Sequence, residues 1–144
     1  MFRRIVGNPF LHLALIFILG LLAYSNTFDA RFLWDEKHFI AANPAVKDFS
    51  FFLDPKKAEG TEYYDALKNR YVGYLTFALN YQLHGLDVRG YHIFNFTVHI
   101  MNAFLVYIFV VLTFRTPFLR ESSLKGRARS VALLTGLIFV SHPI

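Results

Sequence analysis

The 144-residue chain contains no cysteine, which excludes disulfide bonds and thiolate metal sites and leaves its redox compartment open. Acidic residues are absent from long stretches. Residues 1–24 carry Arg3 and Arg4 without any acid, and residues 115–129 carry five basic residues against Glu121 alone. The net charge of +5 is therefore concentrated beside apolar runs, a distribution that argues against nucleic-acid binding.

Apolar and aromatic residues are in excess. They make up 55% of the chain, which contains 17 Phe and 8 Tyr, whereas a soluble domain averages about 45–50% apolar residues. Three apolar runs stand out. Residues 9–28 are long enough to span a membrane and begin at a helix-capping Asn8-Pro9 pair, residues 91–114 are also long enough, and residues 130–144 are shorter. This pattern predicts an all-α membrane protein with about three transmembrane helices.

Two of these runs have alternative interpretations. The first could be a cleaved signal peptide, because its start is basic and Ala23-Tyr24-Ser25 is a weak cleavage pattern. We favour a retained anchor because further apolar runs follow. The third run is too short to span a membrane by itself and ends at His142-Pro143-Ile144, so we expect either a fragment of a longer protein, which we favour, or a half-span.

The distribution of basic residues predicts the orientation in the membrane. Residues 1–8 and the basic loop 115–129 are expected to be cytoplasmic, and residues 29–90 extracytoplasmic. This outer segment is rich in aromatic side chains, which favour the headgroup level of a membrane. Within it, residues 74–87 are predicted to form an interfacial amphipathic helix that ends at Gly85, and residues 44–55 a shorter one. The apolar face of the longer helix is expected to contain Leu75, Ala78, Leu79 and Leu83.

The adjacent carboxylates Asp35 and Glu36 follow the first apolar run. A partly dehydrated carboxylate could take a proton from an acceptor hydroxyl, and the pair could also hold a divalent metal through oxygen ligands, although no cofactor is certain. The alternative is a pair of ordinary solvated loop residues. Arg70 could bind a lipid phosphate, or it could simply extend toward headgroups.

Polar residues also follow one face of the second apolar run. His92, Asn95, His99 and Asn102 are spaced by three and four residues, so they are expected to face other helices or a wet cavity. They could contact a substrate or hydrogen-bond between helices. Metal binding by His92 and His99 is disfavoured because two helical turns separate them. His142 could carry a proton or contact phosphate, or it could be only a helix terminus before Pro143.

Three stretches together resemble a known family. They are "YSNTFDARFLWDEKHFIAANPAVKD" (24–48), "RYVGYLTFALNYQLHGLDVRGYHIFNFTVHIMNAF" (70–104) and "ALLTGLIFVSHPI" (132–144). The order of these stretches is similar to that in the N-terminal part of the multi-spanning C-type glycosyltransferases. The resemblance is strongest to the protein O-mannosyltransferase-like branch, whose members often bear tetratricopeptide repeats. The chain departs from that pattern at Tyr71-Val72, where the family has Pro-Leu, at Glu36, where Asp is more common, and in having three predicted spans rather than about ten.

The resemblance implies transfer of a sugar from a polyprenyl-phosphate carrier to a protein or glycan acceptor on the extracytoplasmic face. It implies that Asp35 is the catalytic base beside Glu36 and that Arg70 lies near the lipid phosphate. His92, Asn95, His99, Asn102 and His142 match family positions and are expected to bind substrate. The partners implied are membrane lipid, the donor and the acceptor, and the location is a multi-pass position in a bacterial inner membrane with a cytoplasmic N-terminus. A fragment is expected to be inactive alone.

Two other classes compete with this interpretation. One is a non-catalytic membrane scaffold or assembly partner with a lipid-binding outer loop. The other is a transporter fragment, which is disfavoured because residues 106–112 are too apolar to line a path through the membrane.

Overall fold

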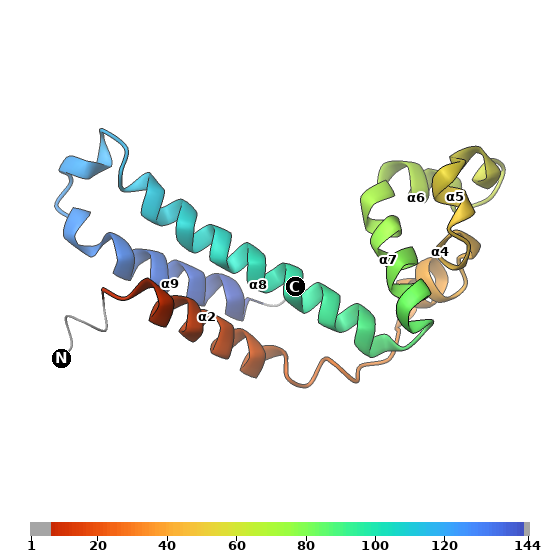
Figure 1. Ribbon diagram of the computed structural model, residues 1–144, viewed down its shortest axis with the longest axis horizontal. Coiled ribbons are helices and arrows are strands. Elements are labelled where there is room, and N and C mark those ends of the chain that lie inside the picture. Colours follow the sequence, from red (N-terminus) through yellow and green to blue (C-terminus); the bar gives the residue numbers. More distant parts are fainter. Residues whose placement is uncertain (1–6, 143–144) are drawn as a thin grey trace. The chain divides into compact units, whose positions relative to one another are not determined.

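A computed structural model describes residues 7–142, except for the side chain of Lys125, and this part of the chain contains helices and turns but no strand (Figure 1). The α-helices are α2 (Pro9–Tyr24), α3 (Trp34–Glu36), α4 (Pro44–Lys47), α5 (Ser50–Leu53), α6 (Tyr64–Asn69), α7 (Tyr71–His84), α8 (Val88–Thr113) and α9 (Ala128–Ser141). A single π-helical turn, η1 (Lys37–Ala41), follows α3, and short 3-10 turns occupy η2 (Pro55–Ala58), η3 (Leu119–Glu121) and η4 (Lys125–Arg127). The predicted all-α class is confirmed for the described residues.

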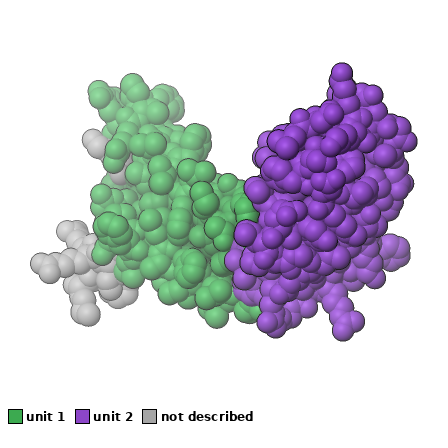
Figure 2. All heavy atoms as spheres, turned by 45° about the vertical axis from the view of Figure 1, so that its right-hand side comes forward, with its two compact units in different colours: residues 1–27, 94–144 green, residues 28–93 purple. Residues whose placement is uncertain are grey.

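The chain divides into two compact units (Figure 2). Unit 1 consists of residues 1–27 and 94–144, and unit 2 of residues 28–93. Helix α8 contributes its first residues to unit 2 and the rest to unit 1.

Unit 1 is formed by α2, α9 and most of α8. Its core contains Ile16 from α2, Ile100, Ala103 and Tyr107 from α8, and Ala132 and Val140 from α9. Glycines allow the helices to approach closely. A Cβ atom at Gly20 would lie 2.6 Å from Ile100 Cδ1 and 2.8 Å from Val140 Cγ2, and one at Gly136 would lie 2.6 Å from Ile16 Cδ1. Small residues at such positions are typical of tightly packed helices in membranes.

The first apolar run begins as predicted but ends earlier. The Asn8 side chain accepts a hydrogen bond from the Phe10 amide, and Pro9 lies in the first turn, so the predicted cap is confirmed. Helix α2 ends at Tyr24 rather than near Phe28. Its 16 residues measure about 24 Å, less than the roughly 30 Å of a hydrocarbon core. Helix α9 has 14 residues, and Pro143 and Ile144 of the predicted third span lie outside the described residues.

Helix α8 is the one helix, among the residues described, that is both long and apolar enough to cross a membrane. It has 26 residues and begins slightly before the predicted span of 91–114. Only 22% of its most apolar window is buried inside the protein. A core helix of a soluble protein would be mostly buried, so the exposure of these apolar side chains favours membrane association.

Unit 2 is a cluster of short helices around an aromatic core, whose buried residues include Phe32, Phe52, Leu67 and Tyr74. Helix α7 packs mainly on α4, and the Tyr71 hydroxyl ties its start to α5 by donating to the Phe52 carbonyl. Gly85 ends α7 with φ +61°, a conformation that suits glycine, so the predicted stop is confirmed.

Candidate functional site

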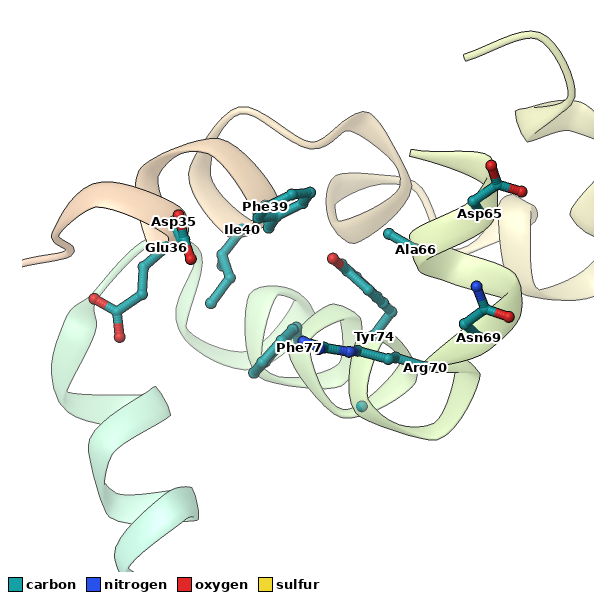
Figure 3. A pocket seen from close by; sticks show the side chains of 11 residues that line it. Asp35, Glu36, Phe39, Ile40, Asp65, Ala66, Asn69, Arg70, Tyr74 and Phe77 are labelled. Carbon is teal, nitrogen blue, oxygen red and sulfur yellow. The ribbon is translucent and has the colours of Figure 1, made fainter. Parts of the chain in front are cut away.

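Unit 2 contains an open cavity of about 590 Å³ (Figure 3). Three of the side chains predicted to form the site, those of Asp35, Glu36 and Arg70, line it. The remaining lining residues are Phe39, Ile40, Asp65, Ala66, Asn69, Gly73, Tyr74 and Phe77. The cavity therefore combines carboxylates, one guanidinium group and an apolar wall.

Local structure places the Asp35–Glu36 pair on one side of the cavity, and Arg70 and Asp65 on the other. Asp35 and Glu36 lie in α3, directly before η1. Arg70 lies between α6 and α7, where it is the C-cap of α6 and the N-cap of α7. Tyr74 and Phe77 lie on one face of α7 and project toward the cavity, and Arg70 lines it from the position directly before this helix.

Glu36 has a structural partner that was not predicted from the sequence. Its Oε2 accepts a hydrogen bond from the Leu33 amide at 3.0 Å and thereby caps the first turn of α3. In Figure 3 the Glu36 carboxylate points away from the other lining side chains, whereas Asp35 is exposed at the cavity. Of the two acids, Asp35 is therefore the one available to a bound molecule.

Trp34, directly before Asp35, has an unusual backbone. Its φ is +38°, which is strained for a residue with a bulky side chain, and the residue is 89% exposed. Left-handed residues that the surrounding structure holds in place are concentrated at binding and catalytic sites. Here the hydrogen bond between Glu36 and the Leu33 amide spans the strained residue.

Tyr74 is a buried polar group of this cavity. Burial raises the pKa of its hydroxyl above the usual value, and the positive charge of Arg70 opposes this shift without cancelling it. The phenol therefore stays protonated at neutral pH and can donate a hydrogen bond. In Figure 3 its hydroxyl end points toward Phe39 and Ile40, and the Arg70 side chain extends toward Phe77.

The histidines of α8 contact backbone carbonyl groups. His92, in unit 2, lies with Nε2 2.9 Å from the Ala30 carbonyl oxygen and does not line the cavity. His99, in unit 1, is buried with Nε2 3.2 Å from the Val140 carbonyl oxygen and stacks on Phe139. His99 thus holds α8 to α9, as the alternative of hydrogen bonding between helices predicts.

The other predicted residues lie in unit 1. Asn95 and Asn102 are exposed on α8. His142 follows α9, and its carbonyl oxygen accepts a 2.6 Å hydrogen bond from the Tyr24 hydroxyl. Because Asp35 and Arg70 belong to unit 2, a pocket shared with these residues stays a prediction.

The aromatic and polar lining of the cavity was not predicted from the sequence. Phe39 follows Asp35, and Tyr74 follows Arg70, each by four residues, which in a helix places both members of a pair on the same face. Applying that spacing rule outward from the charged residues would have identified them. Asp65 and Asn69 carried no such signal, because the short helix α6 was not predicted.

A bound divalent metal stays a prediction. Among the described residues no three histidine or acidic side chains come together in a group that could hold a metal ion. Asp35 and Glu36 would need ligands from a substrate, and Glu36 already accepts a hydrogen bond from Leu33.

The chain matches no protein-family model, no curated protein and no solved structure.

Proposed function

We propose that the chain carries part of the donor site of an integral membrane glycosyltransferase that transfers a sugar from a polyprenyl-phosphate carrier to a protein or glycan acceptor. In this proposal α2, α8 and α9 cross a bacterial inner membrane with the N-terminus in the cytoplasm, and the bilayer thins locally around α2 and α9, which are shorter than its hydrocarbon core. Unit 2 lies on the extracytoplasmic side, with its short helices at the membrane interface.

The observation that carries the proposal is the cavity of unit 2. Asp35 and Arg70, which are distant in the sequence, line the same cavity of about 590 Å³. A guanidinium group suits a phosphate, because its planar donors match the phosphate oxygens. The apolar wall formed by Phe39, Ile40 and Phe77 suits an isoprenoid chain or a sugar face. The cavity thus offers complementary surfaces to both ends of an amphiphilic donor.

The proposed chemistry assigns one role to each charged group. Asp35 takes the proton from the acceptor hydroxyl as that oxygen forms a bond to the anomeric carbon of the sugar. The bond between the anomeric carbon and the phosphate oxygen breaks, and its electron pair leaves with the lipid phosphate. Arg70 stabilises the negative charge that develops on this phosphate, and the protonated Tyr74 can donate a hydrogen bond to it.

Exposed apolar side chains support the membrane placement. Leu33, Trp34, Leu53, Val72 and Leu83 of unit 2 are all exposed, and an aromatic ring beside leucines suits the interface of a lipid bilayer. The exposed apolar surface of α8 suits hydrocarbon. The excess of basic residues in the loop 115–129 supports a cytoplasmic position for this loop.

The competing proposal is a non-catalytic scaffold that binds lipid, and Asp35→Asn separates the two. The substitution keeps the size and polarity of the side chain but removes the base. We expect sugar transfer from a polyprenyl-phosphate donor, measured in membranes of cells that carry the variant in place of the natural copy, to fall by about 10²–10⁴-fold.

The matched control is Asp54→Asn, an exposed acid in the same unit that does not line the cavity. Immunoblotting should show that both variants reach the membrane at natural levels. Transfer that is unchanged by Asp35→Asn would reject the catalytic role and leave the scaffold.

A further inference from the structure

One face of α8 in unit 1 carries an uninterrupted heptad seam. The residues Asn95, Val98, Asn102, Leu105, Phe109 and Leu112 alternate at spacings of three and four, so Asn95, Asn102 and Phe109 occupy a positions and the others d positions. A repeat of this kind keeps the same stripe of a helix facing one partner helix over its whole length.

The seam lies on the exposed side of α8. Its four apolar residues are between 41% and 69% exposed, and both asparagines are exposed as well. The residues that pack against α2 and α9, such as Ile100, Ala103 and Tyr107, lie on a different face of the helix. The seam is therefore free of the helices that form the core of unit 1.

The two asparagine amides add hydrogen-bond donors and acceptors to an otherwise apolar seam. In the part of the chain that the structure describes, neither the Asn95 nor the Asn102 side chain makes a hydrogen bond. Asn102 lies close to the middle of the 26-residue helix, where hydrocarbon would surround it. An unpaired amide is costly at that depth, so a partner that supplies hydrogen bonds is favoured over lipid.

We propose that this seam pairs with the same seam of a second copy of the chain, with the two α8 helices parallel. An asparagine amide both donates and accepts, so it is complementary to another copy of itself. In a parallel pair each a position faces its own counterpart, and Asn95 and Asn102 both find amide partners. An antiparallel pair would place them opposite Val98 or Leu105 and leave them unpaired.

Membrane insertion supports the same geometry. Two copies of one chain carry the same basic flanks and therefore insert with the same orientation, which makes their α8 helices parallel. In hydrocarbon the apolar seam residues contribute van der Waals contact, and the amides set the register and favour association. The inference takes from the proposed function only that α8 crosses a membrane, and it needs no catalytic activity.

Crosslinking through single cysteines tests the geometry directly, because the natural chain has none. Val98→Cys and Leu105→Cys place a thiol on the seam. Met101→Cys and Ile108→Cys have the same seven-residue spacing and are also exposed, but they lie on a neighbouring face. After mild oxidation in membranes we expect disulfide-linked dimers from the first pair and few from the second. Equal yields from both pairs would overturn the proposed interface.

The amides are tested by energy transfer between labelled full-length chains in vesicles as the protein-to-lipid ratio is lowered. We expect Asn102→Leu to weaken the dimer about tenfold, as the loss of interhelical hydrogen bonds predicts. Asn102→Gln should keep most of the association, and Met101→Leu should leave it unchanged. A natural chain that stays monomeric throughout the dilution, or a dimer that tolerates Asn102→Leu, would overturn the proposal.

Discussion

At the scale of single residues, the two members of the predicted acidic pair differ in their surroundings. Asp35 and Glu36 are adjacent in sequence, but Glu36 caps α3 through the Leu33 amide while Asp35 is exposed at the cavity. A dipeptide alone cannot reveal this division. It depends on where α3 begins, and this helix begins at Trp34, whose φ is +38°.

Arg70 provides a prediction at this scale. Arg70→Gln should weaken the binding of a polyprenyl phosphate to the purified chain in nanodiscs by about tenfold, because the charge-assisted hydrogen bonds to the phosphate are lost. Titration with a fluorescent polyprenyl phosphate would measure this change.

Lys68→Gln is the control for Arg70→Gln, since Lys68 is an exposed base in α6 that does not line the cavity. Equal losses in the two variants would indicate general attraction to anionic lipid rather than a site at Arg70.

The sequence predicted those residues whose roles are local. Asn8 and Gly85 act through their own backbone neighbourhood, and both roles are confirmed. The burial of Tyr74 could not be predicted, because it depends on packing among α3–α7 rather than on the side chain itself.

At the scale of elements, polar side chains shorten helices that hydropathy alone would extend. The Ser25 hydroxyl donates to the Leu22 carbonyl, and the Thr27 hydroxyl and amide both donate to the Tyr24 carbonyl. These bonds offer the backbone an alternative to helix, so α2 ends at Tyr24 within an apolar run.

The amphipathic face predicted for residues 74–87 is divided in the same way. Ala78 is buried and Leu75 packs against the core of unit 2, whereas Leu79 and Leu83 are exposed. The periodicity predicted a helix, and α7 is present, but it could not show which part of the apolar stripe faces protein.

Gly20 provides a prediction at this scale. Gly20→Leu should destabilise unit 1 by about 1–3 kcal/mol or more, because even a Cβ atom there would collide with side chains from α8 and α9. Thermal unfolding in detergent, followed by the circular dichroism of the helices, would show the loss.

The comparison variant for Gly20 is Gly73→Ala, which lies on α7 with no neighbour within 4 Å of the added atom. It should leave stability unchanged or raise it slightly, because alanine favours helix. Full stability of Gly20→Leu would contradict the close packing of α2 against its neighbours.

At the scale of the whole molecule, the predicted orientation can be tested with single cysteines in an otherwise cysteine-free chain. Glu62→Cys should react with a membrane-impermeant maleimide added to intact cells, because unit 2 is proposed to be extracytoplasmic. Ser123→Cys should react only after the membrane is opened, because it lies in the basic loop. Labelling of Ser123→Cys in intact cells would reverse or reject this topology.

The left-handed backbone at Trp34 has a mechanical consequence. The same first turn presents the indole outward and carries Asp35, so a backbone movement at Trp34 would also move Asp35. A sugar stacked on the ring, or a lipid headgroup pressing against it, would shift the neighbouring carboxylate as well. A molecule bound to Trp34 outside the cavity would then change the orientation of the Asp35 carboxylate at the cavity.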